Sequence, residues 1–190
     1  MSRWEPNASG RLQRAALELY SERGYDQTTV TEIAKRAGLT ERTFFRYFAD
    51  KREVLFYGSG MLQERLVQGI DDAPATLSPL DAVSAALIAA AEPIEEIREF
   101  SRRRQALVAA NPELQERELI KLATLGAALS DALRRRGVAD PTASLTAQAG
   151  IAVFRIAFER WVDASEDREL SALIQESLDE LRAVTAGARG

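Results

Sequence analysis

Apolar residues recur three and four positions apart along almost the whole chain, which is the spacing of one face of an α-helix. The alternation of Val, Ile and Thr between turns that is typical of a strand appears nowhere at length. We therefore expect an all-α fold. The spacing and the start and stop signals predict helices near 11–23, 30–37, 41–48, 51–69, 80–92, 93–109, 112–136, 141–163 and 167–186.

The composition severely restricts acid/base chemistry near neutral pH. The 190 residues include no Cys and no His, which excludes disulfides, thiolate metal sites, Ser-His-Asp triads and the HExxH zinc site. We expect no catalytic residues, no metal and no cofactor, with a helical-bundle enzyme as the less favoured alternative. No apolar run approaches the roughly 18 residues of a membrane span, and the start lacks a hydrophobic signal core. We expect a cytoplasmic protein with no membrane partner.

Charge is distributed unevenly along the chain. Residues 1–52 carry 10 Lys/Arg against 7 Asp/Glu, a net +3, whereas residues 53–190 carry 15 against 22, a net −7. A basic front part on an acidic remainder indicates an anionic partner at the front. Ordinary scatter of charge is the alternative.

Two short helices are expected on either side of "AGLT", within residues 29–48. Thr29 followed by Glu32 is a capping box that starts the first helix. Gly38 permits a left-handed turn, and Leu39 fills that turn from the core side. This is the layout of a helix-turn-helix, whose second helix enters the major groove of DNA. A purely structural helical hairpin is the alternative.

The second helix, within "TERTFFRYF", has two different faces. Phe44 and Phe48 lie four residues apart and so share the side that packs on the other helices. Arg42 falls on the opposite side near the helix start, where O6 and N7 of guanine are its best-suited partners. Glu41 either restrains Arg42 or accepts a hydrogen bond from N4 of cytosine.

Hydroxyl and ammonium groups around this helix suit phosphate oxygens, namely those of Thr40, Thr43, Tyr47 and Lys51. If Lys51 contacts a phosphate, Lys51→Ala should weaken binding to every DNA sequence and flatten the salt dependence of that binding. A basic stripe across Arg42, Arg46 and Lys51 favours DNA. A face neutralised by Glu41 and Asp50 favours a helical interaction protein without DNA binding.

The stretch "TTVTEIAKRAGLTERTFFRYFADKREVL", with the preceding "RAALELYSERGYDQTTV", resembles the DNA-binding signature of the TetR family of bacterial transcriptional regulators. The resemblance covers residues 11–57 and implies a three-helix DNA-binding domain of the helix-turn-helix type there, after a disordered tail at 1–10. Residues 58–190 would form a larger helical ligand-binding and dimerisation domain. The implied function is that of a homodimeric repressor, which binds a near-palindromic double-stranded DNA operator and is released by a small hydrophobic effector.

The resemblance also assigns roles to positions. Thr29 and Thr31 match contacts made from the start of the first helix of the motif, and Glu41 and Arg42 match base-reading positions. The family often has Gly, Ala or Pro in place of Arg42. It often has Tyr in place of Phe45, where the ring remains for a thymine methyl or a sugar. The full expected set of DNA-contacting residues is Thr29, Thr31, Thr40, Glu41, Arg42, Thr43, Phe45, Arg46, Tyr47 and Lys51.

The last two expected helices suit a dimer interface. The segment "LTAQAGIAVFRIAFERWV" (145–162) is apolar nearly all round, and such a helix is buried on more than one side. In TetR-like proteins these two helices pair with their symmetry mates. The resemblance places five residues in that interface, namely Gly150, Ile151, Leu173, Leu178 and Leu181. A monomer whose core absorbs both helices is the alternative.

A ligand pocket is expected among the middle helices, where alanine-rich segments such as "AALIAAA" (85–91) leave room. Its expected lining is Leu87, Phe100, Arg104, Leu107, Leu122, Phe154 and Phe158, with plain core as the alternative for each. The segment "SRRRQALVAANPELQERELIKLATL" resembles actinobacterial TetR regulators whose ligand domains respond to acyl-CoA. This implies an acyl-CoA or fatty-acid-like effector whose anionic head meets Arg102, Arg103 and Arg104. Solvated surface charge is the alternative.

Overall fold

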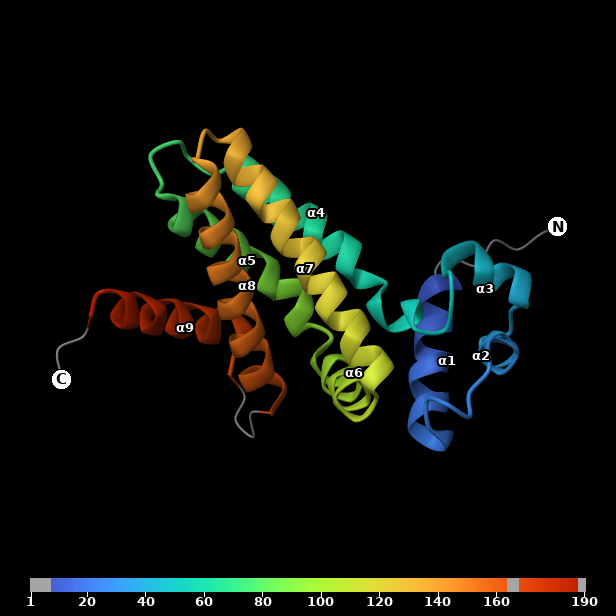
Figure 1. Cartoon of the computed structure of the whole chain (residues 1–190). Coiled ribbons are helices and arrows are strands. Elements are labelled where there is room, and N and C mark those ends of the chain that lie inside the picture. The colour runs from blue at the N-terminus through green and yellow to red at the C-terminus, as the bar shows by residue number, and fades with distance from the viewer. Residues whose placement is uncertain (1–7, 164–167, 188–190) are drawn as a thin grey trace. The chain divides into compact units, whose positions relative to one another are not determined.

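The computed structural model describes residues 8–163 and 168–187, and the regular elements within them are all helical (Figure 1). In chain order they are α1 (Ala8–Arg23), α2 (Val30–Arg36), α3 (Glu41–Tyr47), η1 (Glu53–Phe56), α4 (Gly58–Asp71), α5 (Pro79–Glu95), α6 (Arg98–Ala110), α7 (Pro112–Arg135), α8 (Asp140–Asp163) and α9 (Leu170–Thr185). The all-α prediction is confirmed. The tail expected at 1–10 falls mostly outside the described residues, and residues 8–10 belong to α1.

Several helix boundaries differ from the sequence prediction, and two of the differences concern how a helix begins or ends. The helix expected at 51–69 begins as a single 3-10 turn, η1, and α4 starts only at Gly58. Helix α5 runs through Pro93 to Glu95 instead of ending before the proline. Proline removes one backbone N–H and therefore one helical hydrogen bond. The last turn of a helix tolerates that loss because little helix follows it.

The chain forms two compact units. The first contains the described part of residues 1–59 together with Arg103–Glu118, and the second contains Gly60–Arg102 and the described residues from Leu119 onward. Helices α6 and α7 therefore each contribute residues to both units. The domain boundary expected between residues 57 and 58 stays a prediction. To the front segment the structure adds the corner at which α6 ends and α7 begins.

The core of the first unit is shared by α1, α2 and α3. Leu12 and Leu19 of α1, Ile33 of α2 and Phe44 of α3 are buried almost completely. Side chains of this size contribute roughly 1.5–3 kcal/mol each when they leave water. The short helices α2 and α3, which are too short to be stable alone, are therefore held in place by their packing on α1.

The second unit is built around α5, α8 and α9. Leu87 of α5, Trp161 of α8 and Leu173 of α9 are buried in one apolar cluster. At the crossing of α5 and α8 the backbone of Gly150 comes close to Val83, because a Cβ on Gly150 would lie 2.5 Å from Val83 Cγ1. The small residue at this crossing is therefore required by packing within the chain.

Candidate DNA-binding surface

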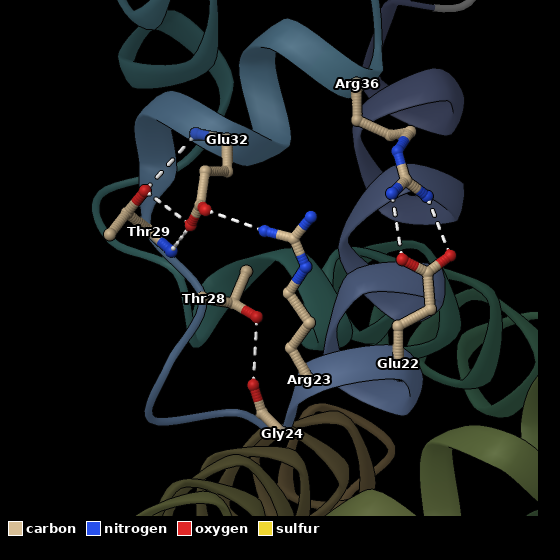
Figure 2. A network of polar contacts seen from close by, with 7 residues as sticks. All are labelled: Glu22, Arg23, Gly24, Thr28, Thr29, Glu32 and Arg36. Carbon is tan, nitrogen blue, oxygen red and sulfur yellow. Dashed lines mark hydrogen bonds and ion pairs between the residues drawn. The ribbon is translucent and has the colours of Figure 1, made fainter.

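Helix α2 begins at a complete capping box. The backbone N–H of Thr29 donates to Glu32 Oε2 at 2.9 Å, and the N–H of Glu32 donates back to Thr29 Oγ1 at 3.3 Å. Figure 2 shows Arg23 of α1 reaching the same Glu32, with 2.9 Å between Arg23 Nη1 and Glu32 Oε1. The bond from the Thr29 backbone is the largest cause that lowers the pKa of Glu32. The carboxylate thus ties the start of α2 to the end of α1.

A second ion pair fastens the other end of α2. Arg36 donates from Nη1 and Nη2 to the two carboxylate oxygens of Glu22, at 2.9 and 2.8 Å (Figure 2). The paired geometry is the strong form of this interaction. Both ends of α2 are therefore fixed on α1 by side chains as well as by the core.

The turn between α2 and α3 depends on Gly38 for two reasons. Its φ of +67° is a conformation that L side chains rarely adopt, and a Cβ there would lie 2.8 Å from Arg11 Nη2. The same guanidinium donates a hydrogen bond to the carbonyl of Ala37, at the end of α2. Arg11 was not among the residues singled out from the sequence, because its partner lies 26 positions away.

Helix α3 has the two faces expected from its sequence. Thr40 caps it by accepting a hydrogen bond from the N–H of Thr43 at 3.2 Å. Phe44 and Phe48 are buried, with ring centroids 5.4 Å apart. Phe45 is 55% exposed on the other side and meets Phe44 edge to face at 5.4 Å. The buried pair fixes the rotation of the helix and so decides which side chains it presents.

The presented face carries cations that the nearby carboxylates leave free of ion pairs. Arg42 is exposed, and its side chain has no hydrogen bond or ion pair with any residue of 8–163 or 168–187. Glu41 accepts instead from Thr31 Oγ1 at 2.6 Å, and Asp50 pairs with Arg52 at 2.6 Å. Neither carboxylate therefore forms an ion pair with Arg42 or Arg46 among the described residues.

Arg46 and Tyr47 form a second exposed group at the end of α3. Arg46 Nη2 donates to the Tyr47 hydroxyl at 3.1 Å, and its guanidinium carbon lies 4.9 Å from the centre of the Tyr47 ring. One cation and one hydroxyl are thus presented together on the face that carries Arg42. Both are groups that commonly contact phosphate oxygens of DNA.

Lys51 lies in a different environment from these residues. Its Nζ donates to the carbonyls of Tyr25, Asp26 and Thr28 at 2.9, 3.4 and 3.2 Å, and it sits 4.3 Å from the centre of the Tyr25 ring. The continuous stripe expected across Arg42, Arg46 and Lys51 therefore has only its first two members on the free face.

The seven residues expected to line a ligand pocket are divided between the two units. Leu87 and Phe154 belong to the apolar cluster of the second unit, and Leu122 and Phe158 are partly buried against it. Phe100 is half-buried elsewhere in that unit. Leu107 and Arg104 belong to the first unit. The cavity proposed from the sequence stays a prediction.

Arg104 has partners inside the first unit. Its Nε donates to the carbonyl of Leu55 at 2.8 Å, its Nη2 donates to Glu118 at 3.0 Å, and its guanidinium lies over the ring of Phe56 at 4.7 Å. An anionic ligand head would have to compete with Glu118 for this charge. The contacts instead fasten the corner of α6 and α7 to η1.

The five residues expected at a dimer interface lie in the chain's own core or pack against it. Leu173 and Leu178 are buried in the cluster of the second unit, as is Ile151, while Gly150 faces Val83 and Leu181 is partly buried against the cluster. Their assignment to a dimer interface stays a prediction. Large apolar residues that are exposed on α8 and α9 are Leu145 (73%), Ile156 (43%) and Val184 (78%). In a helix that is apolar all round, residue spacing alone does not identify the outer face.

Other kinds of site find no support in the described ranges. No group of three or more His, Cys, Asp or Glu residues is placed to hold a metal ion there. None of the helices in the described part of the chain is long and apolar enough to cross a membrane.

Two family models match the chain. The model described as "Bacterial regulatory proteins, tetR family" matches residues 12–57, which contain the helix-turn-helix. The model described as "MftR C-terminal domain" matches residues 77–186, which is more than half of the chain.

Among curated relatives, TcmR of Streptomyces glaucescens is 41% identical over 75 residues, covering 40% of this chain and 33% of TcmR. The regulator MftR of Mycobacterium tuberculosis is 33% identical over 107 residues, covering 55% of this chain and 52% of MftR. The chain thus spans about a third and about half of the length of these two relatives.

Solved structures of similar proteins cover nearly the whole chain. FadR of Thermus thermophilus, a TetR family transcriptional repressor in complex with lauroyl-CoA, is 25% identical with a TM-score of 0.56, over 96% of this chain and 95% of FadR. SmeT of Stenotrophomonas maltophilia, in complex with triclosan, has a TM-score of 0.66 over 93% of this chain and 90% of SmeT. At 21% identity SmeT shows the fold alone. The helix-turn-helix geometry and both family matches show that the chain belongs to the TetR family of bacterial regulatory proteins, whose members are regulators and not enzymes.

Proposed function

We propose that this protein is a DNA-binding transcriptional repressor of the cytoplasm whose helix α3 enters the major groove. The observation that carries the proposal is Arg42, an exposed cation without an ion pair among the described residues, on a helix locked by the buried rings of Phe44 and Phe48. A rigid support lowers the entropy lost on binding. We assign the Arg42 guanidinium to O6 and N7 of a guanine.

The groups around Arg42 are assigned to the DNA backbone and to the neighbouring base pair. Hydroxyls and a guanidinium for phosphate come from both helices of the motif, namely from Thr29, Thr31, Thr40, Thr43, Arg46 and Tyr47. Phe45 lacks a hydroxyl, so its exposed ring can offer only apolar contact, for which the thymine methyl is the apolar group of the major groove. We assign Glu41, whose carboxylate accepts a hydrogen bond from Thr31 Oγ1, to N4 of a cytosine.

We propose a homodimer formed through the outer faces of α8 and α9. The support is the exposure of Leu145, Ile156 and Val184 on these two helices, since large apolar side chains in water favour association. A two-fold dimer presents two α3 helices about 34–36 Å apart and calls for a near-palindromic operator. Sedimentation of the wild type and of an Ile156→Glu variant tests the interface, because a charge there should shift the protein towards monomer.

We propose a small hydrophobic effector of the acyl-CoA or fatty-acid type, bound by the second unit. The support is the apolar, alanine-rich core of that unit and the likeness over nearly the full chain to a FadR that holds lauroyl-CoA. The effector would favour a dimer whose α3 helices are wrongly spaced for the two half-sites, and DNA affinity would fall by the coupling free energy.

Fluorescence anisotropy with the DNA upstream of the protein's own gene tests the proposal. We expect binding that is tighter than to a shuffled duplex and is weakened by lauroyl-CoA. Laurate and free CoA, added separately, show which part of the effector is recognised. Equal binding to the operator candidate and the shuffled duplex would favour the alternative, a helical interaction protein without sequence-specific DNA binding.

A further inference from the structure

The ammonium of Lys51 joins two segments that flank the DNA-facing helices. Lys51 lies three residues after Phe48, which ends α3, whereas its three carbonyl partners lie in the loop between α1 and α2. The last partner, Thr28, directly precedes Thr29, the residue that caps α2. One side chain thus sets the start of α2 against the segment that follows α3.

The ammonium of Lys51 lies among side chains that are mostly buried. Tyr25 and Thr28 are buried, and the ring of Tyr25 lies under the Lys51 Nζ at 4.3 Å. Tyr20, also buried, donates from its hydroxyl to the Lys51 carbonyl at 2.6 Å and meets the Tyr25 ring at 5.2 Å. Burial is the largest cause that raises the pKa of Tyr25, to about 12, so this ring stays uncharged at neutral pH. We name Tyr20, Tyr25, Thr28 and Lys51 the lysine clamp.

The three carbonyl groups of the lysine clamp can occupy all the N–H donors of the Lys51 ammonium. An ammonium has three N–H donors, and three carbonyls lie within 3.4 Å of it. Moving Nζ to a DNA phosphate would leave the Thr28 carbonyl without this donor, while the Tyr25 carbonyl would keep only its bond from the Thr28 N–H at 3.2 Å. A polar group that loses its partner where water does not replace it costs about 1–3 kcal/mol. A solvated lysine would reach a phosphate without that loss.

We infer that Lys51 is a positioning residue for DNA binding, which sets the start of α2 relative to α3 and does not itself neutralise a phosphate. This inference rests on the DNA-binding function proposed above. It replaces the phosphate contact expected from the sequence. Lys51 then affects DNA affinity through the geometry of both helices, while the number of phosphates neutralised stays the same.

The salt dependence of operator binding separates the two roles. Lys51→Met keeps most of the aliphatic stem and removes the ammonium. We expect its operator affinity to fall roughly tenfold, the scale of one charged hydrogen bond, while the slope of log K against log salt stays that of the wild type. Loss of a phosphate contact would instead reduce the slope by about 0.9. A fall of that size in the slope overturns the inference.

Lys35→Met is the matched control. Lys35 is exposed on α2, and its side chain has no hydrogen bond or ion pair among the described residues. Both variants lose one lysine from the same unit, but only Lys51→Met should speed amide exchange in the loop of residues 24–28. If Lys51→Met lowers the melting temperature while its folded form binds operator as tightly as the wild type, the role is merely structural and the inference is wrong.

NMR detection of the lysine ¹⁵N ammonium groups tests the clamp in the unaltered protein, even where Lys51→Met fails to fold. We expect the Lys51 ammonium to exchange slowly with water, and to show no through-bond coupling to phosphorus when operator DNA is added. A fast-exchanging ammonium in the free protein overturns the clamp itself. That result is independent of whether the protein binds DNA, so failure of the proposed function would be seen separately, as absent operator binding by the wild type.

Discussion

Gly38 is needed both for the conformation of the turn and for the close approach of Arg11. Its backbone is left-handed at φ +67°, and the space that a Cβ would fill is taken by the Arg11 guanidinium that bonds to the carbonyl of Ala37. The requirement for glycine therefore has a conformational part and a steric part. A second glycine, Gly24, has φ +88° but nothing within 4 Å of a Cβ.

We predict that Gly38→Ala destabilises the protein more than Gly24→Ala does. Both variants bear the left-handed backbone cost, about 1–2 kcal/mol, but only Gly38→Ala also displaces Arg11. Urea unfolding of the two variants measures the difference. Equal losses of stability would mean that the Arg11 contact contributes nothing to the turn.

The capping box of α2 predicts that the Glu32 carboxylate makes the stability of the protein depend on pH. The folded state lowers the pKa of Glu32, chiefly through the hydrogen bond from the Thr29 backbone. A lowered pKa contributes stability at pH values above the ordinary value of about 4.3, and this stability is lost as pH falls through the lowered pKa. Glu32→Gln should therefore flatten the dependence of the melting temperature on pH in that acidic range.

Glu64→Gln is the control for this effect, because Glu64 is exposed and its side chain has no hydrogen bond or ion pair within the described ranges. If Glu32→Gln and Glu64→Gln change the pH profile alike, Glu32 has no special part in acid unfolding.

At the scale of elements, the sequence predicted the features that depend on residues close together in the chain. The Thr29 and Thr40 caps and the buried pair of Phe44 and Phe48 are formed as expected, because each depends on residues three or four positions apart. The contacts of Lys51 and Arg104 were not predictable in this way. Their partners lie 14 or more positions away, and residue type alone suggested a free cation.

The faces of α8 show the same limit. Its sequence is apolar on nearly every side, so periodicity could not show that Gly150 faces α5 within the chain while Leu145 points to solvent. The depth of a residue in such a helix is set by its neighbours in space. The sequence therefore predicted the helix, and the structure was needed to orient it.

The crossing of α5 and α8 leads to a prediction at this scale. A Cβ on Gly150 would lie 2.5 Å from Val83 Cγ1, whereas one on Gly126 of α7 would meet the flexible end of Gln148 at 2.9 Å. Gly150→Ala should destabilise the protein by about 1–3 kcal/mol through overpacking. Gly126→Ala should be neutral or stabilising, since Ala favours helix. Thermal unfolding measures both, and a harmless Gly150→Ala would contradict the tight crossing.

At the scale of the whole molecule, the front unit includes more than the family's DNA-binding segment. Residues Arg103–Glu118 pack with residues up to 59, fastened by Arg104 on Leu55 and by the ion pair of Arg117 with Glu53. Helices α6 and α7 continue from this corner into the second unit. Helix α4 also crosses between the units, since Gly58 and Ser59 belong to the first and Gly60 onward to the second. These three helices are the continuous elements through which the effector proposed for the second unit would act on the helix-turn-helix.

A single binding experiment can test directly whether Arg42 reads a guanine from the exposed face of α3. Operator affinity is measured for the wild type, for Arg42→Ala and for Arg65→Ala, an exposed arginine of α4 without a side-chain partner among the described residues. Each protein is tested on normal operator and on operator in which one guanine at a time is 7-deazaguanine, which lacks N7. We expect one guanine whose change costs the wild type and Arg65→Ala about 1–3 kcal/mol and leaves Arg42→Ala unaffected. Equal sensitivity of all three proteins at every guanine would contradict it.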